Sequence, residues 1–312
     1  MKRIPKPEHA SFDWRMKRHR DNEGRCVFGA SEAGAVMGVS EFTSRPELYA
    51  SKIDDPIITP PTPAMLKGIY FEDGLGAFAA HELGLELHQP QEMFAHGRWV
   101  STLDYATHDL SVIAECKVTS AHTVDSATDL PSSWVMQGHV QHYCTGAQIF
   151  FSVFDRRQRL SVHQLEIKPW LIDELNEMAE LLGSAVDERT IPDWLENEMN
   201  ADMIQRLIPI DEGKRIEADA ELVDWISDLE QAKKMKKQAE EAEQFARDQI
   251  ASRMRDAEYV MCDGITVLSW KQQKGRSRFD SDTFKANHPD LFAKYTVQGA
   301  PIRVMRFGKG NK

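Results

Sequence analysis

Apolar residues in the first 190 positions recur with two different periods, which predicts that both helices and strands are present. Steps of three and four predict amphipathic helices at 64–83 and 169–186. Pro131 opens a further helix that ends near Thr145. Apolar or alternating runs predict short strands at 92–95, 98–103, 111–118, 147–154 and 159–167. Helices and strands that follow one another in this order favour an α/β core with a mixed central sheet flanked by helices.

Two shorter helices are predicted in the N-terminal part of the chain. Ser31 is expected to cap a small-residue helix that stops at Gly38, and Ser44 precedes a helix with Pro46 near its start. Residues 1–190 are therefore predicted to form the core domain, and 191–215, which are polar and contain prolines, to form a linker.

The pattern changes again after the linker, and residues 216–312 are predicted to form a long helix with a small basic α/β appendage. Apolar residues from Leu222 to Met254 recur at steps of three and four, but the charged middle of the helix, QAKKMKKQAEEAEQ, has only alanines inward. This pattern favours a solvated helix or half of an antiparallel pair over a long two-stranded coiled coil. A hairpin at 259–270, a helix at 279–295 broken at Pro289, and a strand at 302–307 are expected to follow.

Composition excludes several classes of protein. Charged residues make up 28% and the hydrophobic set 41% of the chain, as in ordinary soluble proteins. No apolar run approaches the roughly 20 residues that span a bilayer, and no apolar segment follows the basic N-terminus, so we expect a cytoplasmic protein with no membrane partner. The four cysteines are scattered with no C-x-x-C pair, which disfavours a disulfide framework or a zinc ribbon.

The net charge of −11 argues against a protein that coats nucleic acid electrostatically. It does not exclude an enzyme with a local basic groove, because acidic clusters that bind Mg²⁺ add negative charge themselves. Residues 261–312 hold ten Lys or Arg against four acids, so basic charge is concentrated in the appendage.

The stretch IAECKVTS, at 113–120, places an acid and a base at the end of a predicted strand. Glu115 and Lys117 project to the same side, because strand side chains alternate with a period of two. They can form an exposed ion pair, or they can belong to a metal-dependent nuclease site. Asp104 ends the preceding strand, and a turn would bring it beside Glu115 and Lys117. Two carboxylates with the Cys116 carbonyl between them are ligands that a hard cation prefers.

Two flanking helices carry further candidates. Glu72 lies on the same predicted inward stripe as Ile69 and Leu75, where a carboxylate is costly unless it is paired or binds a metal. It can also be an ordinary glutamate at the edge of the helix. Gln137, one turn before Gln141, can orient a water or a phosphate oxygen, or it can be a core glutamine satisfied by the backbone.

Five segments in order, within residues 20–190, resemble the PD-(D/E)xK nuclease superfamily, and within it the YqaJ-type phage recombination exonucleases related to lambda exonuclease. They are RCVFGASEAGAVMGVS, GIYFE with Glu72, TLDY with Asp104, AECK, and WVMQGHVQHYCTG with Gln137. Leu103 stands where the family name places proline, which changes no ligand.

The resemblance implies roles for these residues. Asp104, Glu115 and the Cys116 carbonyl would hold Mg²⁺, for which Mn²⁺ can substitute, and Glu72 would complete a second metal site. Lys117 would orient or deprotonate the attacking water. Gln137, Ser31 and Thr102 would contact phosphate. Arg25 would bind a 5′-phosphate, or Arg20 would replace it, because the spacing from Arg25 to Ser31 is one residue shorter than in some relatives.

The resemblance also implies an activity and partners. The expected enzyme digests one strand of duplex DNA from its 5′ end and leaves 3′ tails for a single-strand annealing recombinase, as a toroidal trimer in the cytoplasm of a bacterial host. Two other functions stay open. One is a nuclease-fold module that binds DNA or a recombinase without cutting, and the other is a structure-specific endonuclease.

Overall fold

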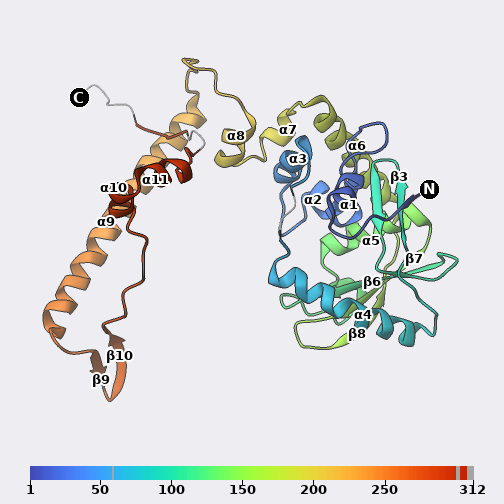
Figure 1. Cartoon of the computed structure of the whole chain (residues 1–312), viewed down its shortest axis with the longest axis horizontal. Coiled ribbons are helices and arrows are strands. Elements are labelled where there is room, and N and C mark those ends of the chain that lie inside the picture. Colours follow the sequence, from blue (N-terminus) through green and yellow to red (C-terminus); the bar gives the residue numbers. More distant parts are fainter. Residues whose placement is uncertain (58–59, 300–302, 308–312) are drawn as a thin grey trace. The chain divides into compact units, whose positions relative to one another are not determined.

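The computed structural model describes residues 1–57, 60–299 and 303–307. The chain divides into two compact units, Met1–Pro209 and Ile210–Lys312. Figure 1 labels their helices and strands. None of the helices in the described part of the chain is long and apolar enough to cross a membrane.

A mixed four-stranded sheet carries the strand that ends in Glu115 and Lys117. Its order is β5 (Tyr105–Ala106), β6 (Val112–Val118), β7 (Gln148–Phe154) and β8 (Leu160–Gln164). The β6 and β7 strands are parallel, whereas β5 and β8 run antiparallel to their neighbours. Parallel neighbours need a crossover, which contains α5 (Ser132–Thr145). The predicted α/β core with a mixed sheet and flanking helices is confirmed.

A second four-stranded sheet corrects the expectation of one central sheet. Its order is β1 (Lys2–Pro5), β3 (Glu92–His96), β4 (Trp99–Thr102) and β2 (Phe28–Gly29). The chain leaves this sheet after Thr102 and joins the first sheet at Tyr105. Leu103 and Asp104 therefore lie in the connection between the two sheets. The sequence did not predict this division, because the alternation of apolar and polar residues does not show which neighbour a strand pairs with.

The helix α4 (Pro63–Leu83) packs on β6 and β7 through its second half. Leu75, Gly76 and Ala79 are buried there, and an added Cβ at Gly76 would stand 2.3 Å from the Tyr105 ring. The predicted inward stripe is wrong for the first half, because Met65 and Ile69 are exposed. The helix α6 (Pro169–Glu188) buries its apolar stripe as predicted, including Leu171, Leu175, Ala179 and Leu182.

The shorter helices of unit 1 are α1 (Phe12–Lys17), the 3-10 helix η1 (Ala30–Glu32), α2 (Ala33–Val36), α3 (Arg45–Ile53) and the 3-10 helix η2 (Ala127–Asp129). Pro46 lies near the start of α3 as predicted, and Ser44 caps this helix by accepting the Glu47 N–H. Ser31 is not a cap, because it lies inside η1 and α2 begins two residues later.

The predicted linker begins with residues that belong to unit 1. They contain α7 (Asp193–Glu196) and α8 (Ala201–Leu207). Leu195, Met199 and Met203 are buried in the main hydrophobic core. The polar and proline content of this segment therefore hid apolar residues that are spaced too irregularly to show a helical period.

Unit 2 consists of α9 (Ala220–Met254), β9 (Tyr259–Cys262), β10 (Ile265–Ser269), α10 (Ser281–Asn287) and α11 (Pro289–Tyr295). The hairpin turn has positive φ at Asp263 and Gly264, 49° and 80°, as a two-residue Asp-Gly turn requires. The helix predicted at 279–295 breaks before Pro289 as expected. The predicted strand at 302–307 is wrong for 303–307, and Ile302 lies outside the described residues.

Candidate active site

Glu115 and Lys117 form a close ion pair at the end of β6. Lys117 Nζ lies 2.8 Å from Glu115 Oε1, and Glu115 is 4% exposed. Burial acts to lower the pKa of Lys117, but the charges of Glu115 and Asp104 outweigh it and the pKa is raised. The pair is therefore not the exposed strand-end ion pair that the sequence left open.

Two glutamines of α5 contact this pair with their side chains. Lys117 Nζ donates to Gln137 Oε1 at 2.8 Å, and Gln137 Nε2 donates to Glu115 Oε1. Gln141 Nε2 donates to the other carboxylate oxygen, Glu115 Oε2. Both glutamines are buried, and neither serves the backbone-satisfied role that was the alternative for Gln137.

The second amide atom of Gln141 is left without a partner. Gln141 Oε1 is buried and accepts no hydrogen bond within the part of the chain that the structure describes. The amide cannot profitably flip, because its oxygen would then face the Glu115 carboxylate. A buried carbonyl oxygen without a donor is costly, and a water in this site would satisfy it.

Asp104 adjoins the pair from the connection between β4 and β5. Its Oδ2 accepts the Cys116 N–H at 2.8 Å. Burial, followed by the charges of Glu115 and Glu72, raises the pKa of Asp104 well above its ordinary value. The predicted convergence of Asp104, Glu115 and Lys117 thus occurs, and the carboxylates are close enough to repel one another.

Glu72 approaches from α4. Burial and then the charge of Glu115 raise its pKa. The Glu72 carbonyl accepts the Cys116 thiol at 3.7 Å, and its carboxylate is 3.5 Å from Gln89 Nε2. Burial and the neighbouring carboxylates, Asp104 first, also raise the pKa of Cys116, so the thiol stays neutral. Glu72 is therefore half-buried and within electrostatic reach of Glu115 and Asp104.

The chemistry of this cluster suits a hard divalent cation, which prefers carboxylate oxygens. Neighbouring carboxylate charge helps to raise the pKa of Asp104 and of Glu72, and a positive charge among the carboxylates would offset that repulsion. As they stand, however, no three His, Cys, Asp or Glu side chains in the described residues form a group that could hold a metal ion. Both Glu115 oxygens are engaged by Lys117, Gln137 and Gln141, so Glu115 would have to release one of them to bind a cation.

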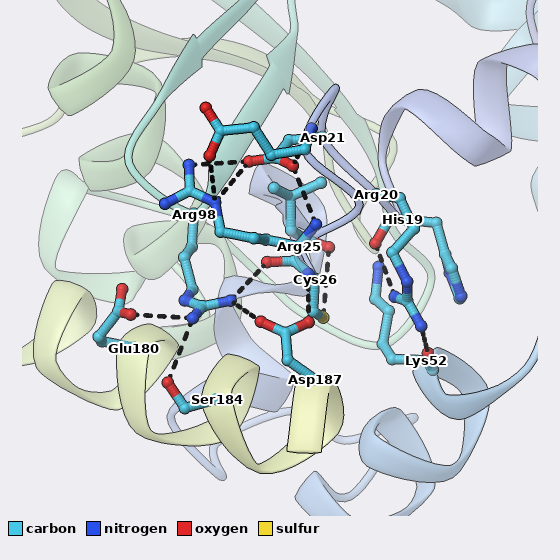
Figure 2. A network of polar contacts seen from close by, with 12 residues as sticks. His19, Arg20, Asp21, Arg25, Cys26, Lys52, Arg98, Glu180, Ser184 and Asp187 are labelled. Atoms are coloured by element: carbon cyan, nitrogen blue, oxygen red, sulfur yellow. Dashed lines mark hydrogen bonds and ion pairs between the residues drawn. The ribbon is translucent and has the colours of Figure 1, made fainter. Parts of the chain in front are cut away.

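The two arginines predicted for phosphate binding have other partners. Figure 2 shows Arg25 paired with Asp21, at 2.8 Å, and it also lies 3.4 Å from Glu23. Arg20 donates to the backbone carbonyls of His19 and Lys52. The side chain that contacts Ser31 is Arg18, which donates to Ser31 Oγ.

Arg18 was missed by sequence reasoning, and its position depends on tertiary contacts. Its guanidinium lies 4.3 Å from the Trp14 ring and packs on Gly29, where a Cβ would be 2.1 Å from Nη2. A pocket of about 400 Å³ is lined by Trp14, Arg18, Ser31, Glu32 and Lys52, among others. Burial lowers the pKa of Arg18, while Glu32 and then Glu115 act in the opposite direction, so this pocket lies within electrostatic reach of the β6 cluster.

Thr102 ends β4 two residues before Asp104 and pairs across the sheet with Met93. It is half-buried. Its position beside Asp104 is compatible with the predicted phosphate contact, which stays a prediction.

Comparisons with known proteins give remote matches in fold. No protein-family model matches the chain, and no curated protein matches it in sequence. The solved structures that it resembles include an alkaline exonuclease from Laribacter hongkongensis, at 18% identity over 60% of this chain and 97% of the other, with a TM-score of 0.46. The complex of that exonuclease with dAMP matches at 20% identity over 57% and 94% of the two chains, with a TM-score of 0.48.

A phage-related exonuclease from Haemophilus somnus 129PT is similar at 12% identity over 54% of this chain and 96% of the other, with a TM-score of 0.41. All three identities are 20% or less and all three TM-scores are below 0.5. The function proposed below therefore rests on the geometry of the site.

Proposed function

We propose that the protein is a metal-dependent deoxyribonuclease that digests one strand of duplex DNA from its end. The observation that carries this proposal is the buried network of Glu115, Lys117 and Gln137 beside the carboxylates of Asp104 and Glu72. Phosphodiester hydrolysis needs a positioned water and positive charge where the phosphorane oxygens become more negative. The network supplies a fixed cation next to a set of carboxylates.

Lys117 is the cation of this network. Its raised pKa keeps the ammonium charged at neutral pH. A charged Lys117 favours water orientation and stabilisation of the developing negative charge over deprotonation of the water. Gln137, which accepts from Lys117 and donates to Glu115, fixes the position of both side chains. The unpartnered Gln141 oxygen provides an acceptor for a water in the same place.

Mg²⁺, or Mn²⁺ in its place, would be held by Asp104 and Glu115, with Glu72 and the Cys116 carbonyl as further ligands. When bound, the ion supplies a Lewis acid that polarises the phosphate and lowers the pKa of bound water. The mutual repulsion of the carboxylates supports the presence of such an ion.

End recognition is assigned to the pocket of Arg18 and Ser31. A half-buried guanidinium beside a hydroxyl suits a terminal 5′-phosphate. This proposal gives Arg18 the role first expected of Arg25 or Arg20, and it supports digestion from the 5′ end. A 3′-tailed product, an annealing recombinase as partner and a toroidal trimer stay predictions from the family resemblance.

The test is an assay of 5′-labelled linear duplex with Mg²⁺ and with EDTA. We expect Mg²⁺-dependent loss of duplex, and no loss with Glu115→Gln, whose shape is nearly unchanged. Glu174→Gln, an exposed substitution on α6, is the matched control and should digest DNA like the unmodified protein.

Two outcomes would redirect the proposal. Binding of duplex ends without cutting would indicate the non-cutting module, and cutting of a covalently closed circle would indicate an endonuclease. A comparison of 5′-phosphate with 5′-hydroxyl duplex in Arg18→Ala and Arg25→Ala tests the pocket, because only Arg18→Ala should narrow the preference for phosphate.

A further inference from the structure

The helix α9 is unusually exposed for its length. Its 35 residues span about 52 Å at 1.5 Å per residue. Met254 is its only buried residue, whereas Trp225 is 63% exposed and Leu229 37%. Most helices in proteins are stabilised by the packing of an apolar face. We therefore expect the exposed apolar side chains of α9 to pack against another surface.

Three of the large apolar side chains, Trp225, Leu229 and Ile250, lie on one seam with coiled-coil spacing. Alternate steps of four and three connect Trp225, Leu229, Ala232, Lys236, Ala239, Glu243, Ala246 and Ile250. The spacing reads the same from either end, about a midpoint between Lys237 and Gln238. Large apolar residues stand at the two ends, and alanines alternate with Lys236 and Glu243 between them.

The C-terminal end of α9 carries a pocket of a size to accept a large side chain. It has a volume of about 560 Å³ and is lined by Ile250 and Met254 of α9 and by Leu268 and Trp270 of the hairpin, among others. The opposite end of α9 carries the exposed Trp225 ring. The exposed Trp225 ring and the pocket beside Ile250 thus lie at opposite ends of α9.

We propose that α9 pairs antiparallel with α9 of a second copy of this chain. In a pairing centred between Lys237 and Gln238, Trp225 lies level with the partner subunit's Ile250 and fills its pocket, and the reverse contact forms at the other end. Leu229 packs on the partner subunit's Ala246. Burial of a tryptophan removes about 150–250 Å² from water, and this contact occurs twice.

The charges on α9 select the antiparallel direction. Lys233 and Glu240 both flank the seam on the same side, and the antiparallel pairing places Lys233 beside the partner subunit's Glu240, twice over. Both residues are exposed, although Lys233 also lies over the Phe307 ring. A parallel pairing would instead put Lys236 against the partner's Lys236 and Glu243 against the partner's Glu243 within the seam, where like charges are costly.

The test measures the mass of the full chain by light scattering, with reductant present because Cys262 is exposed. We expect Lys233→Glu and Glu240→Lys each to halve the mass found for the unmodified chain, whatever further association unit 1 makes. An equimolar mixture of the two variants should regain the original mass, because both charge pairs between positions 233 and 240 of the mixed dimer are again attractive. Trp225→Ala should also halve the mass.

Lys237→Glu is the matched control. This variant makes the same charge change next to Lys236, at a position that neither belongs to the seam nor flanks it. The mass of the full chain should therefore not change. Equal masses for the unmodified chain and Lys233→Glu would overturn the proposal, as would a mixture that stays at half mass. The readout is independent of DNA digestion, so the nuclease proposal can fail without affecting this one.

Discussion

Acidic side chains have opposite surroundings in two regions of unit 1. Asp155, in the turn between β7 and β8, is 2% exposed and accepts from the Arg159 guanidinium at 2.7 Å and from the backbone N–H groups of Arg157 and Arg159. These hydrogen bonds, the Arg159 side chain first, lower the pKa of Asp155 to about 2. At the end of β6, burial and neighbouring carboxylates raise the pKa of Asp104 and Glu72.

Arg98 provides a second example of the paired kind. Figure 2 shows its guanidinium between Glu180 and Asp187 of α6, at 2.9 and 2.7 Å, with Ser184 alongside. Asp187 in turn accepts the Cys26 N–H, which ties α6 to the start of the β2 segment. Asp155, Asp187 and Glu180 of the scaffold are each paired with an arginine, whereas Asp104 and Glu72 of the candidate site lie near other carboxylates that raise their pKa. Acidic groups whose pKa is raised by burial and by like charges are candidates for a functional site.

The largest effect is expected from removal of the site's cation. Lys117→Met keeps the length of the side chain but leaves Glu115 and Asp104 without their positive neighbour. We expect the digestion rate to fall by about 10²–10⁴, the range for a positioned catalytic group, with an unchanged circular dichroism spectrum. Activity within a factor of two of the unmodified protein would contradict the assignment.

Removal of Arg98, a cation of the scaffold, should lower the stability of the protein and leave its digestion rate unchanged. Arg98→Ala leaves Asp187, whose side chain is 25% exposed, without its ion-pair partner, and we expect the free energy of unfolding to fall by about 1–3 kcal/mol, as when one partner of a hydrogen bond is removed. Glu180 adds little because its side chain is 65% exposed. Urea titration measures the loss, while the digestion rate per folded molecule should be retained. Arg157→Ala, on an exposed side chain, is the control.

Neutralisation of one site carboxylate should stabilise the protein while it abolishes digestion. When the pKa of a carboxyl is raised in the folded state, the folded protein becomes less stable as the pH rises through that raised pKa. Asp104→Asn removes this repulsion and keeps an acceptor for the Cys116 N–H, so we expect the free energy of unfolding at pH 7 to rise. Urea titration without metal measures it.

Added Mg²⁺ gives a separate readout of the same site. It should raise the melting temperature of the unmodified protein, because an ion that binds only the folded state stabilises it. The Asp104→Asn variant should show no such rise. A rise of equal size in both proteins would place the ion elsewhere.

The smallest effect is expected from Asp155, on the stability of the protein at low pH. Its pKa is lowered in the folded state, so its contribution to stability is present above the unfolded-state pKa of about 3.9 and is lost as the pH falls towards about 2. Melting temperatures between pH 5 and pH 2.5 should therefore fall less steeply for Asp155→Asn than for the unmodified protein. Parallel curves would show that Asp155 is not responsible.

Local chemistry determined the elements and part of the site. The period of two put Glu115 and Lys117 on one side of β6, and the Asp263-Gly264 turn set the hairpin. The step pattern from Leu222 onward gave α9 with its correct extent to within a few residues. These features depend on residues that are neighbours along the chain, so the sequence displays them directly.

Only the tertiary structure decided which distant groups meet. Arg18 reaches Ser31 because Gly29 has no side chain in its path, and nothing in RMKRHR distinguishes Arg18 from the basic residues around it. The separation of β4 from β5 into two sheets, the exposure of the first half of α4 and the inclusion of residues 191–209 in unit 1 were likewise hidden. A periodic pattern records which side of an element is apolar, but it does not name the surface that covers that side.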